Sequence, residues 1–210
     1  MVESHIDVED SACRGDLKVY LDAAPGVGKT HQMLDAARDL QRRGTDVVIG
    51  VAETHGRPET LSLCEGLESL PLKEVEYEGK QLQEFDLDAA LKRRPQILLL
   101  DELAHWNIPG ARHPRRYQDI EELLDQGITV WTAMSIQHLE SLSDVVASIT
   151  GIRMRETVPD SVLDRASDIV LVDATPSELL ERLEQGKVHL PERTSATGEG
   201  YFSPSNLCTL

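Results

Sequence analysis

The sequence has few cysteines and no long apolar run, and each shortage excludes a class of protein. The three cysteines, Cys13, Cys64 and Cys208, are odd in number and far apart. This spacing argues against a zinc site or a disulfide framework and fits a reducing cytoplasm. No apolar run approaches the roughly 20 residues that a membrane-spanning helix needs, and the N-terminus lacks the apolar stretch of a signal peptide. We therefore expect a cytoplasmic segment with no direct insertion into a membrane.

Positive charge is also scarce, because 21 Lys and Arg residues face 37 Asp and Glu residues and leave a net charge of −16. Such a surface repels polyanions, so we expect no nucleic-acid partner. A small phosphate site is still allowed, since backbone N–H groups and a single lysine are enough to build one. The length of 210 residues and the 40% of apolar residues suit one domain with a core, with room for a small appendage.

Short apolar runs alternate with amphipathic segments along the chain. Strands are expected over 17–21, 47–49, 97–100, 128–133 and 169–172. Helices are expected over 29–43, from Pro58 through Leu67, over 86–94, from Tyr117 to a stop at Gly127, from Leu139 to a stop at Gly151, and over 176–185. Alternation between 73 and 85 around a Glu-Gly turn predicts a small hairpin. The pattern predicts a three-layer α/β fold with a mainly parallel sheet flanked by helices.

Residues 23–30 read Ala-Ala-Pro-Gly-Val-Gly-Lys-Thr and fit the Walker A pattern of P-loop NTPases, with alanine at the first position. A predicted strand precedes this segment and a predicted helix follows it. Two glycines allow backbone N–H groups to point inward at phosphates, while the lysine would reach the β- and γ-phosphates and the threonine would bind Mg²⁺. The nucleotide-binding candidates are Ala24, Pro25, Gly26, Val27, Gly28, Lys29 and Thr30. The competing interpretation is a glycine-rich turn that binds nothing.

The predicted strand 97–100 is wholly apolar and is followed by Asp101 and Glu102, which is the Walker B arrangement. Asp101 would hold Mg²⁺, directly or through water. Glu102 stands where many P-loop ATPases place the base that activates water, so it is a catalytic candidate. The alternatives are a strand-end carboxylate for Asp101 and a helix cap or ion-pair partner for Glu102.

Three further polar side chains follow predicted strands, where open α/β sheets place ligands. Arg57 would pair with the γ-phosphate, or else belong to a capped turn before Pro58. Gln137 would orient a water or contact the γ-phosphate. Arg112 lies in a basic loop that would supply an arginine finger; the alternative is a solvated face that pairs with nearby acids such as Glu122.

Taken together, these segments resemble the N-terminal cytoplasmic region of the KdpD potassium sensor histidine kinases. The resemblance covers roughly Arg14 to Leu190 and rests on residues 17–30, 53–57, 101–105, 112–114, 116–119, 137–142 and 155–160. It implies an ATP-binding regulatory domain in a two-component system that controls potassium uptake, with the parent protein in the inner membrane. The other domains of the same sensor would be its partners, and adenine enters only through this resemblance.

We expect three parts: a flexible acidic arm at 1–14, a nucleotide-binding sensor domain at 15–190 and a linker rich in Gly, Ser, Thr and Pro at 191–210, which by the resemblance leads toward a missing next domain. We expect this chain to lack the phosphorylated-histidine kinase core. Family members usually carry Gly where Asp22 stands and Asn where Ser135 stands. Asp22 adds an anion beside the phosphate site, which would weaken binding or change its pH dependence. Other readings are an independent P-loop ATPase, a small-molecule kinase, or an interaction domain with a vestigial loop.

Overall fold

The computed structural model describes residues 14–185, 188, 203–207 and 209. Nearly all of the arm predicted at 1–14 and most of the linker predicted at 191–210 lie outside these residues. Within the described part of the chain, no helix is both long and apolar enough to cross a membrane.

Six described strands form one sheet in the order β3-β2-β6-β7-β1-β8, and every neighbouring pair is parallel. The strands are β1 (Leu17–Asp22), β2 (Val47–Val51), β3 (Glu68–Ser69), β6 (Ile97–Leu100), β7 (Thr129–Ser135) and β8 (Asp168–Leu171). The mainly parallel sheet predicted from the apolar runs is therefore confirmed. The exception is β3, which is two exposed residues long and offered no apolar run to detect.

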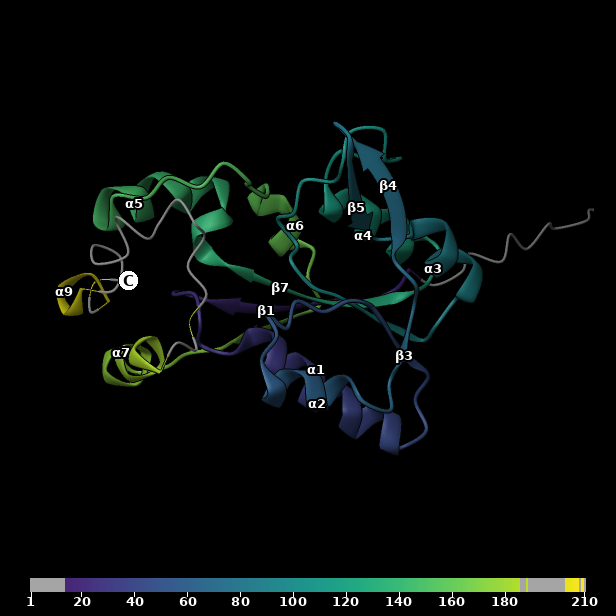
Figure 1. Ribbon diagram of the computed structural model, residues 1–210, viewed down its shortest axis with the longest axis horizontal. Coiled ribbons are helices and arrows are strands. Elements are labelled where there is room, and N and C mark those ends of the chain that lie inside the picture. The colour runs from purple at the N-terminus through teal and green to yellow at the C-terminus, as the bar shows by residue number, and fades with distance from the viewer. Residues whose placement is uncertain (1–13, 186–187, 189–202, 208, 210) are drawn as a thin grey trace, which may run out of the picture.

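Helices cover both faces of the sheet, as Figure 1 shows, with α1 and α2 below it and α3, α4 and α6 above it. Their bounds are α1 (Lys29–Arg42), α2 (Pro58–Cys64), α3 (Leu87–Arg93), α4 (Arg116–Asp125), η1 (Ile136–His138), α5 (Glu140–Thr150), α6 (Asp160–Asp164), α7 (Pro176–Glu184) and α9 (Pro204–Leu207). The short helix α6 was not predicted, because five residues carry too little periodicity to recognise.

The core has two halves because side chains alternate along each strand. In β1, Val19 and Leu21 pack on one face with the α4 residue Ile120, whereas Tyr20 packs on the other face with the α1 residue Met33. A strand that is buried on both faces reads as a continuous apolar run, which explains why these strands were visible in the sequence.

A separate antiparallel hairpin, β4 (Lys73–Tyr77) and β5 (Lys80–Glu84), stands beside α3 and α4 (Figure 1). Its two turn residues, Glu78 and Gly79, have φ of 50° and 76°. Positive φ at both positions matches the twist of a two-residue hairpin turn. The hairpin predicted at 73–85 is confirmed, and its last residue, Glu84, enters the interior of the protein.

The topology brings several loops to one edge of the sheet. Because all six strands are parallel, the segments that follow β1, β2, β6 and β7 all leave from the carboxyl edge. The strand order in the sheet places β1 between β7 and β8, fifth of the six strands, so the loop after β1 lies beside the ends of β7 and β8 at the carboxyl edge. Ligands of open α/β sheets bind at such a position.

Candidate functional site

The loop 23–30, which we call the glycine loop, connects β1 to α1. Gly26 and Gly28 have φ of 93° and 104°, a region that residues with a Cβ rarely adopt. Gly28 is the N-cap of α1 and has no side chain to cap the helix. The first N–H groups of α1 therefore receive no bond from an N-cap side chain, and the positive end of the helix is available to an anion.

Lys29, the first residue of α1, points back toward the end of β1. Its Nζ pairs with Asp22 Oδ2 and lies 3.1 Å from Ser135 Oγ at the end of β7. Asp22 and Ser135 are both buried. Burial raises the pKa of the Asp22 carboxyl, and the charge and hydrogen bond of Lys29 oppose that shift. Lys29 is therefore held beneath the glycine loop by a carboxylate of the same chain.

Thr30 and Asp101 are 71 residues apart in sequence and meet at the carboxyl edge of the sheet. Thr30 Oγ1 donates a hydrogen bond to Asp101 Oδ2 at 2.7 Å. The N–H of Glu53 donates to the same oxygen at 3.2 Å, and the N–H of Glu102 donates to Asp101 Oδ1 at 2.9 Å. These bonds orient a buried carboxylate toward the first turn of α1.

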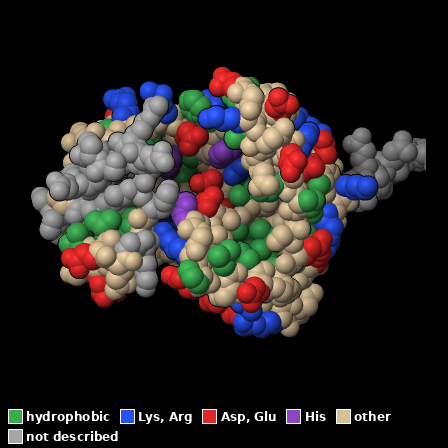
Figure 2. Space-filling model, in the orientation of Figure 1, with side chains coloured by type: hydrophobic (Ala, Val, Ile, Leu, Met, Phe, Trp, Pro, Cys, Tyr) green, Lys and Arg blue, Asp and Glu red, His purple; other side chains and the backbone are tan. Residues whose placement is uncertain are grey.

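Two adjoining cavities, of about 150 and 80 Å³, share Lys29, Thr30, Glu53 and His55. The larger one is also lined by Asp101, Glu102, Ala104, His105, Ala133, Met134, Ser135, His138 and Glu156. The smaller one is also lined by Gly26, Gly28, His31, Arg57 and Thr60. Figure 2 shows acidic, basic and histidine side chains gathered around a hollow near the middle of one face. Side chains predicted from both motifs, Lys29 and Thr30 from the first and Asp101 from the second, therefore line the larger cavity together.

Glu102 lies at the rim of this space with φ of 60°, an uncommon conformation for a residue with a Cβ. Partial burial and the neighbouring Asp101 raise the pKa of its carboxyl, while Arg116 and His105 oppose the rise. The Arg116 guanidinium lies 3.9 Å from the Glu102 carboxylate. A carboxylate with a raised pKa is a better proton acceptor near neutral pH than an ordinary glutamate.

A buried ion pair between Arg116 and Glu84 lies next to Asp101. Arg116, the first residue of α4, donates to Glu84 Oε1 at 2.8 Å and to the carbonyl of Asp101 at 3.1 Å. Glu84 also contacts His105 Nε2 at 3.1 Å and accepts hydrogen bonds from the N–H groups of Phe85 and Ile108. The Arg116 guanidinium therefore connects the last residue of the hairpin, Glu84, with the backbone of Asp101.

The other three predicted residues occupy different places. Arg57 lines the smaller cavity and is also the N-cap of α2, so its contact with phosphate stays a prediction. Gln137 is buried and is not among the residues that line either cavity, although its neighbour His138 is. Arg112 is not brought to the site: its guanidinium pairs with Asp88 and with Glu122. The alternative interpretation of the basic loop, a face that pairs with nearby acids, describes Arg112 better.

Sequence reasoning missed a contact made by α7. Arg182 donates to the carbonyls of Gly26 and Val27 at 3.1 and 2.8 Å. A Cβ built on Gly26 would lie 2.7 Å from a methyl group of Val188, so that residue also packs against the loop. These contacts join positions about 155 residues apart, and no local pattern announces them.

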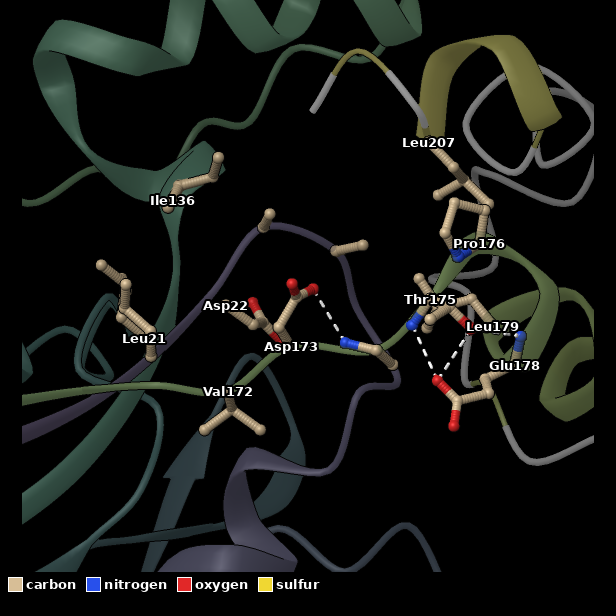
Figure 3. A pocket seen from close by; sticks show the side chains of 14 residues that line it. Leu21, Asp22, Ile136, Val172, Asp173, Thr175, Pro176, Glu178, Leu179 and Leu207 are labelled. Atoms are coloured by element: carbon tan, nitrogen blue, oxygen red, sulfur yellow. Dashed lines mark hydrogen bonds between the residues drawn. The ribbon is translucent and has the colours of Figure 1, made fainter.

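Larger cavities flank the glycine loop. One of about 590 Å³ is lined by Gln32 and Arg182, among others, and shares Gly26, Gly28, His31, Arg57 and Thr60 with the 80 Å³ cavity. Another, of about 750 Å³, lies between the ends of β1 and β8 and is mostly apolar (Figure 3). In Figure 3, Thr175 and Glu178 hydrogen-bond each other at the rim, where they form the capping box of α7.

A family model and several curated proteins that match this chain carry the same name, KdpD. The family model described as "KdpD: Osmosensitive K+ channel His kinase sensor domain" matches residues 13–210. The sensor protein KdpD of Escherichia coli is 54% identical over 94% of this chain, and that of Mycobacterium tuberculosis is 51% identical over 94%. A putative sensor protein KdpD of Synechocystis is 48% identical over 94% of this chain.

The aligned region is a small part of some relatives, because the chain spans 22% of the E. coli protein and 23% of the M. tuberculosis protein, but 53% of the Synechocystis protein. The family match nevertheless extends over nearly the whole chain, including every residue of the two cavities described above. This chain belongs to the KdpD family and corresponds to its osmosensitive K⁺ channel His kinase sensor domain.

Proposed function

We propose that this chain is the ATP- and Mg²⁺-binding regulatory domain of a KdpD-type sensor histidine kinase, in a two-component system that controls potassium uptake. The observation that carries the proposal is the 2.7 Å contact between Thr30 and Asp101. Thr30 ends the segment that we propose as Walker A, and Asp101 is the carboxylate that we propose as Walker B; P-loop proteins use a contact of this kind for Mg²⁺.

The residues suit a magnesium ion that arrives with a nucleotide. A hydroxyl and a carboxylate are hard oxygen ligands, which Mg²⁺ prefers, and Mg²⁺ commonly takes one or two protein ligands together with substrate phosphates. No group of three or more His, Cys, Asp or Glu in the described residues is arranged to hold a metal alone. Thr30 and Asp101 would therefore hold Mg²⁺ that is also bound to the β- and γ-phosphates, where it would neutralise phosphate charge.

The glycine loop suits the triphosphate itself. Lys29 supplies the cation, Gly26 and Gly28 allow close approach of the backbone, and α1 supplies its positive end. The adjoining 590 Å³ cavity, with His31 and Gln32 in its wall, has room for the nucleoside. Adenine as the base follows from the family and not from these contacts.

The regulatory role follows from which loops would contact the ligand. Occupancy would order the segments that follow β1, β2 and β6, and α7 touches the glycine loop from outside through Arg182. A ligand that binds one arrangement of these loops better than another shifts the population toward it. The other domains of the parent sensor would be the partners that respond to this shift.

The test is calorimetric titration with the Mg²⁺ complex of a non-hydrolysable ATP analogue. We expect the wild type and Lys80→Ala to bind equally, because Lys80 is exposed on the hairpin. Lys29→Ala and Asp101→Asn should weaken binding by about 100-fold or more, as each removes a charge-assisted contact. Equal affinity for all four proteins, or no binding by the wild type, would contradict the proposal.

A second function, a weak ATPase, is favoured by the raised pKa of Glu102 beside Asp101. Turnover of about 1 s⁻¹ or faster, within the ordinary range of enzymes, that is lost in Glu102→Gln would support it. Tight binding with negligible turnover, unchanged by Glu102→Gln, would contradict the ATPase and support the regulatory function only. A small-molecule kinase would need a site for a phosphate acceptor, and none of the described residues identifies one.

A further inference from the structure

The carboxylate of Asp22 occupies an unusual position for a chain that binds phosphate. It ends β1, directly before the glycine loop, and its side chain has no exposed surface. One oxygen, Oδ2, pairs with Lys29 Nζ. The other, Oδ1, is buried and has no hydrogen-bond partner among the residues that the structure describes. The lysine that would bind phosphate is thus the main compensation for a buried negative charge.

Within the described part of the chain, Lys29 is the only Lys or Arg that acts on the Asp22 carboxyl. From α1 this carboxyl faces Lys29, from the end of β7 the Ser135 hydroxyl, and from η1 His138. Burial lowers the pKa of His138, which favours its neutral form. Asp173, which follows β8, lines the 750 Å³ cavity together with Asp22 and adds negative charge on that side. Moving Lys29 away would therefore leave an anion in a poorly solvated place.

Phosphate binding would require that movement or a sharing of the ammonium group. A buried carboxylate that loses its only ion-pair partner is strongly destabilised, and it relieves the penalty by taking up a proton. We propose that Asp22 competes with the triphosphate for Lys29, so that binding of the Mg²⁺–nucleotide takes up a proton from solvent at Asp22. This inference rests on the function proposed above.

The direction of the pH dependence follows from the same contacts. Burial already raises the pKa of Asp22, and the charge and hydrogen bond of Lys29 restrain the rise. When Lys29 turns to phosphate, the restraint weakens and the pKa rises further. Protonated Asp22 is neutral and no longer competes. Affinity for the nucleotide should therefore increase as pH falls, for as long as the triphosphate itself stays ionised.

The experiment measures proton uptake by calorimetry. The Mg²⁺ complex of a non-hydrolysable ATP analogue is titrated at pH 8 into wild type and Asp22→Asn, in buffers with different ionisation enthalpies. Both titrations share the protons of the ligand, so the difference between them belongs to Asp22. We expect the wild type to take up as much as one proton more, and Asp22→Asn to bind about tenfold tighter at pH 8, with the gap closing at lower pH.

Asp144→Asn is the matched control, because it makes the same chemical change at an exposed carboxylate of α5 that pairs with Arg153 and lines none of the four cavities around the glycine loop. It should keep the wild-type affinity and proton number. Asp22→Gly is the second variant should the amide not fold. Equal affinity and equal proton number in wild type and both Asp22 variants would overturn the inference while leaving the proposed function intact. Failure of the wild type and all variants to bind would overturn both.

Discussion

At the scale of single residues, the pair of Arg116 and Glu84 shows how the site is supported. Both side chains are buried, and Arg116 also holds the carbonyl of Asp101. Arg116→Ala should lower the free energy of unfolding by about 3–5 kcal/mol, because it leaves Glu84 as an uncompensated buried charge. Urea denaturation monitored by tryptophan fluorescence measures the change.

The matched control for that variant is Arg153→Ala. The pair of Arg153 and Asp144 is exposed on both sides, and such pairs contribute about 0–1 kcal/mol. Similar losses for the two variants would mean that the buried pair contributes no more than a surface one.

Glu84 also makes a prediction about acid stability. Burial alone would raise its pKa, but the hydrogen bonds of His105 and the Phe85 N–H, with the charge of Arg116, lower it from 4.5 to about 2. A pKa depressed in the folded state stabilises the fold above the unfolded value, and the contribution disappears as pH falls through the folded value. From this shift we expect a contribution of about 3 kcal/mol at neutral pH.

Comparison of the wild type with Glu84→Gln isolates this contribution. The difference in their free energies of unfolding should be constant above about pH 5 and should shrink between about pH 4.5 and 2. Thermal unfolding at a series of pH values measures it. A difference that grows on acidification would show that the sign is wrong.

At the scale of elements, α7 acts as a brace on the glycine loop. Arg182 donates to two loop carbonyls across 155 and 156 residues of sequence. Arg182→Ala should loosen the loop and weaken nucleotide binding by about fivefold to tenfold, since it removes two charge-assisted hydrogen bonds on a partly exposed surface. Calorimetry gives the affinity, and hydrogen exchange at the loop amides reports the loosening. Lys92→Ala, on the distant α3, is the control that should change neither.

Elements of this fold were predictable to the extent that they carry local signals. The strand at 97–100 was predicted with its observed bounds because four apolar residues stand between polar ones. The helix predicted over 176–185 corresponds to α7, whose start carries a local signal, the capping box of Thr175 and Glu178. In contrast, β3 and α6 are held by pairing and packing with distant segments, so their own residues gave no signal.

The candidate site divides in the same way. Two motifs predicted Lys29, Thr30 and Asp101 as site residues, because phosphate and Mg²⁺ chemistry needs those residue types at fixed spacing, and the three line one cavity. Arg112 had the right chemistry for a phosphate contact but pairs with Asp88 and Glu122, and one-dimensional spacing cannot reveal that choice.

At the scale of the whole molecule, the net charge of −16 should oppose the arrival of a negatively charged nucleotide complex. Added salt screens such repulsion. Stopped flow with a fluorescent ATP analogue measures the association rate constant. This constant should rise roughly severalfold between 20 and 200 mM NaCl. Replacing the exposed Glu74 and Glu76 with Lys should flatten this dependence. A rate that falls with salt would indicate local attraction that outweighs the overall charge.

The position of β1 in the sheet has a consequence for biosynthesis. Its described neighbours are β7 and β8, which begin at residues 129 and 168. Because a ribosome delivers residues in order, at about 5–20 per second, β1 leaves the exit tunnel roughly 5–20 s before its first neighbour. During that interval the nascent chain carries an unpaired apolar strand. The glycine loop, which follows this strand, cannot acquire its final shape until translation has nearly passed β8.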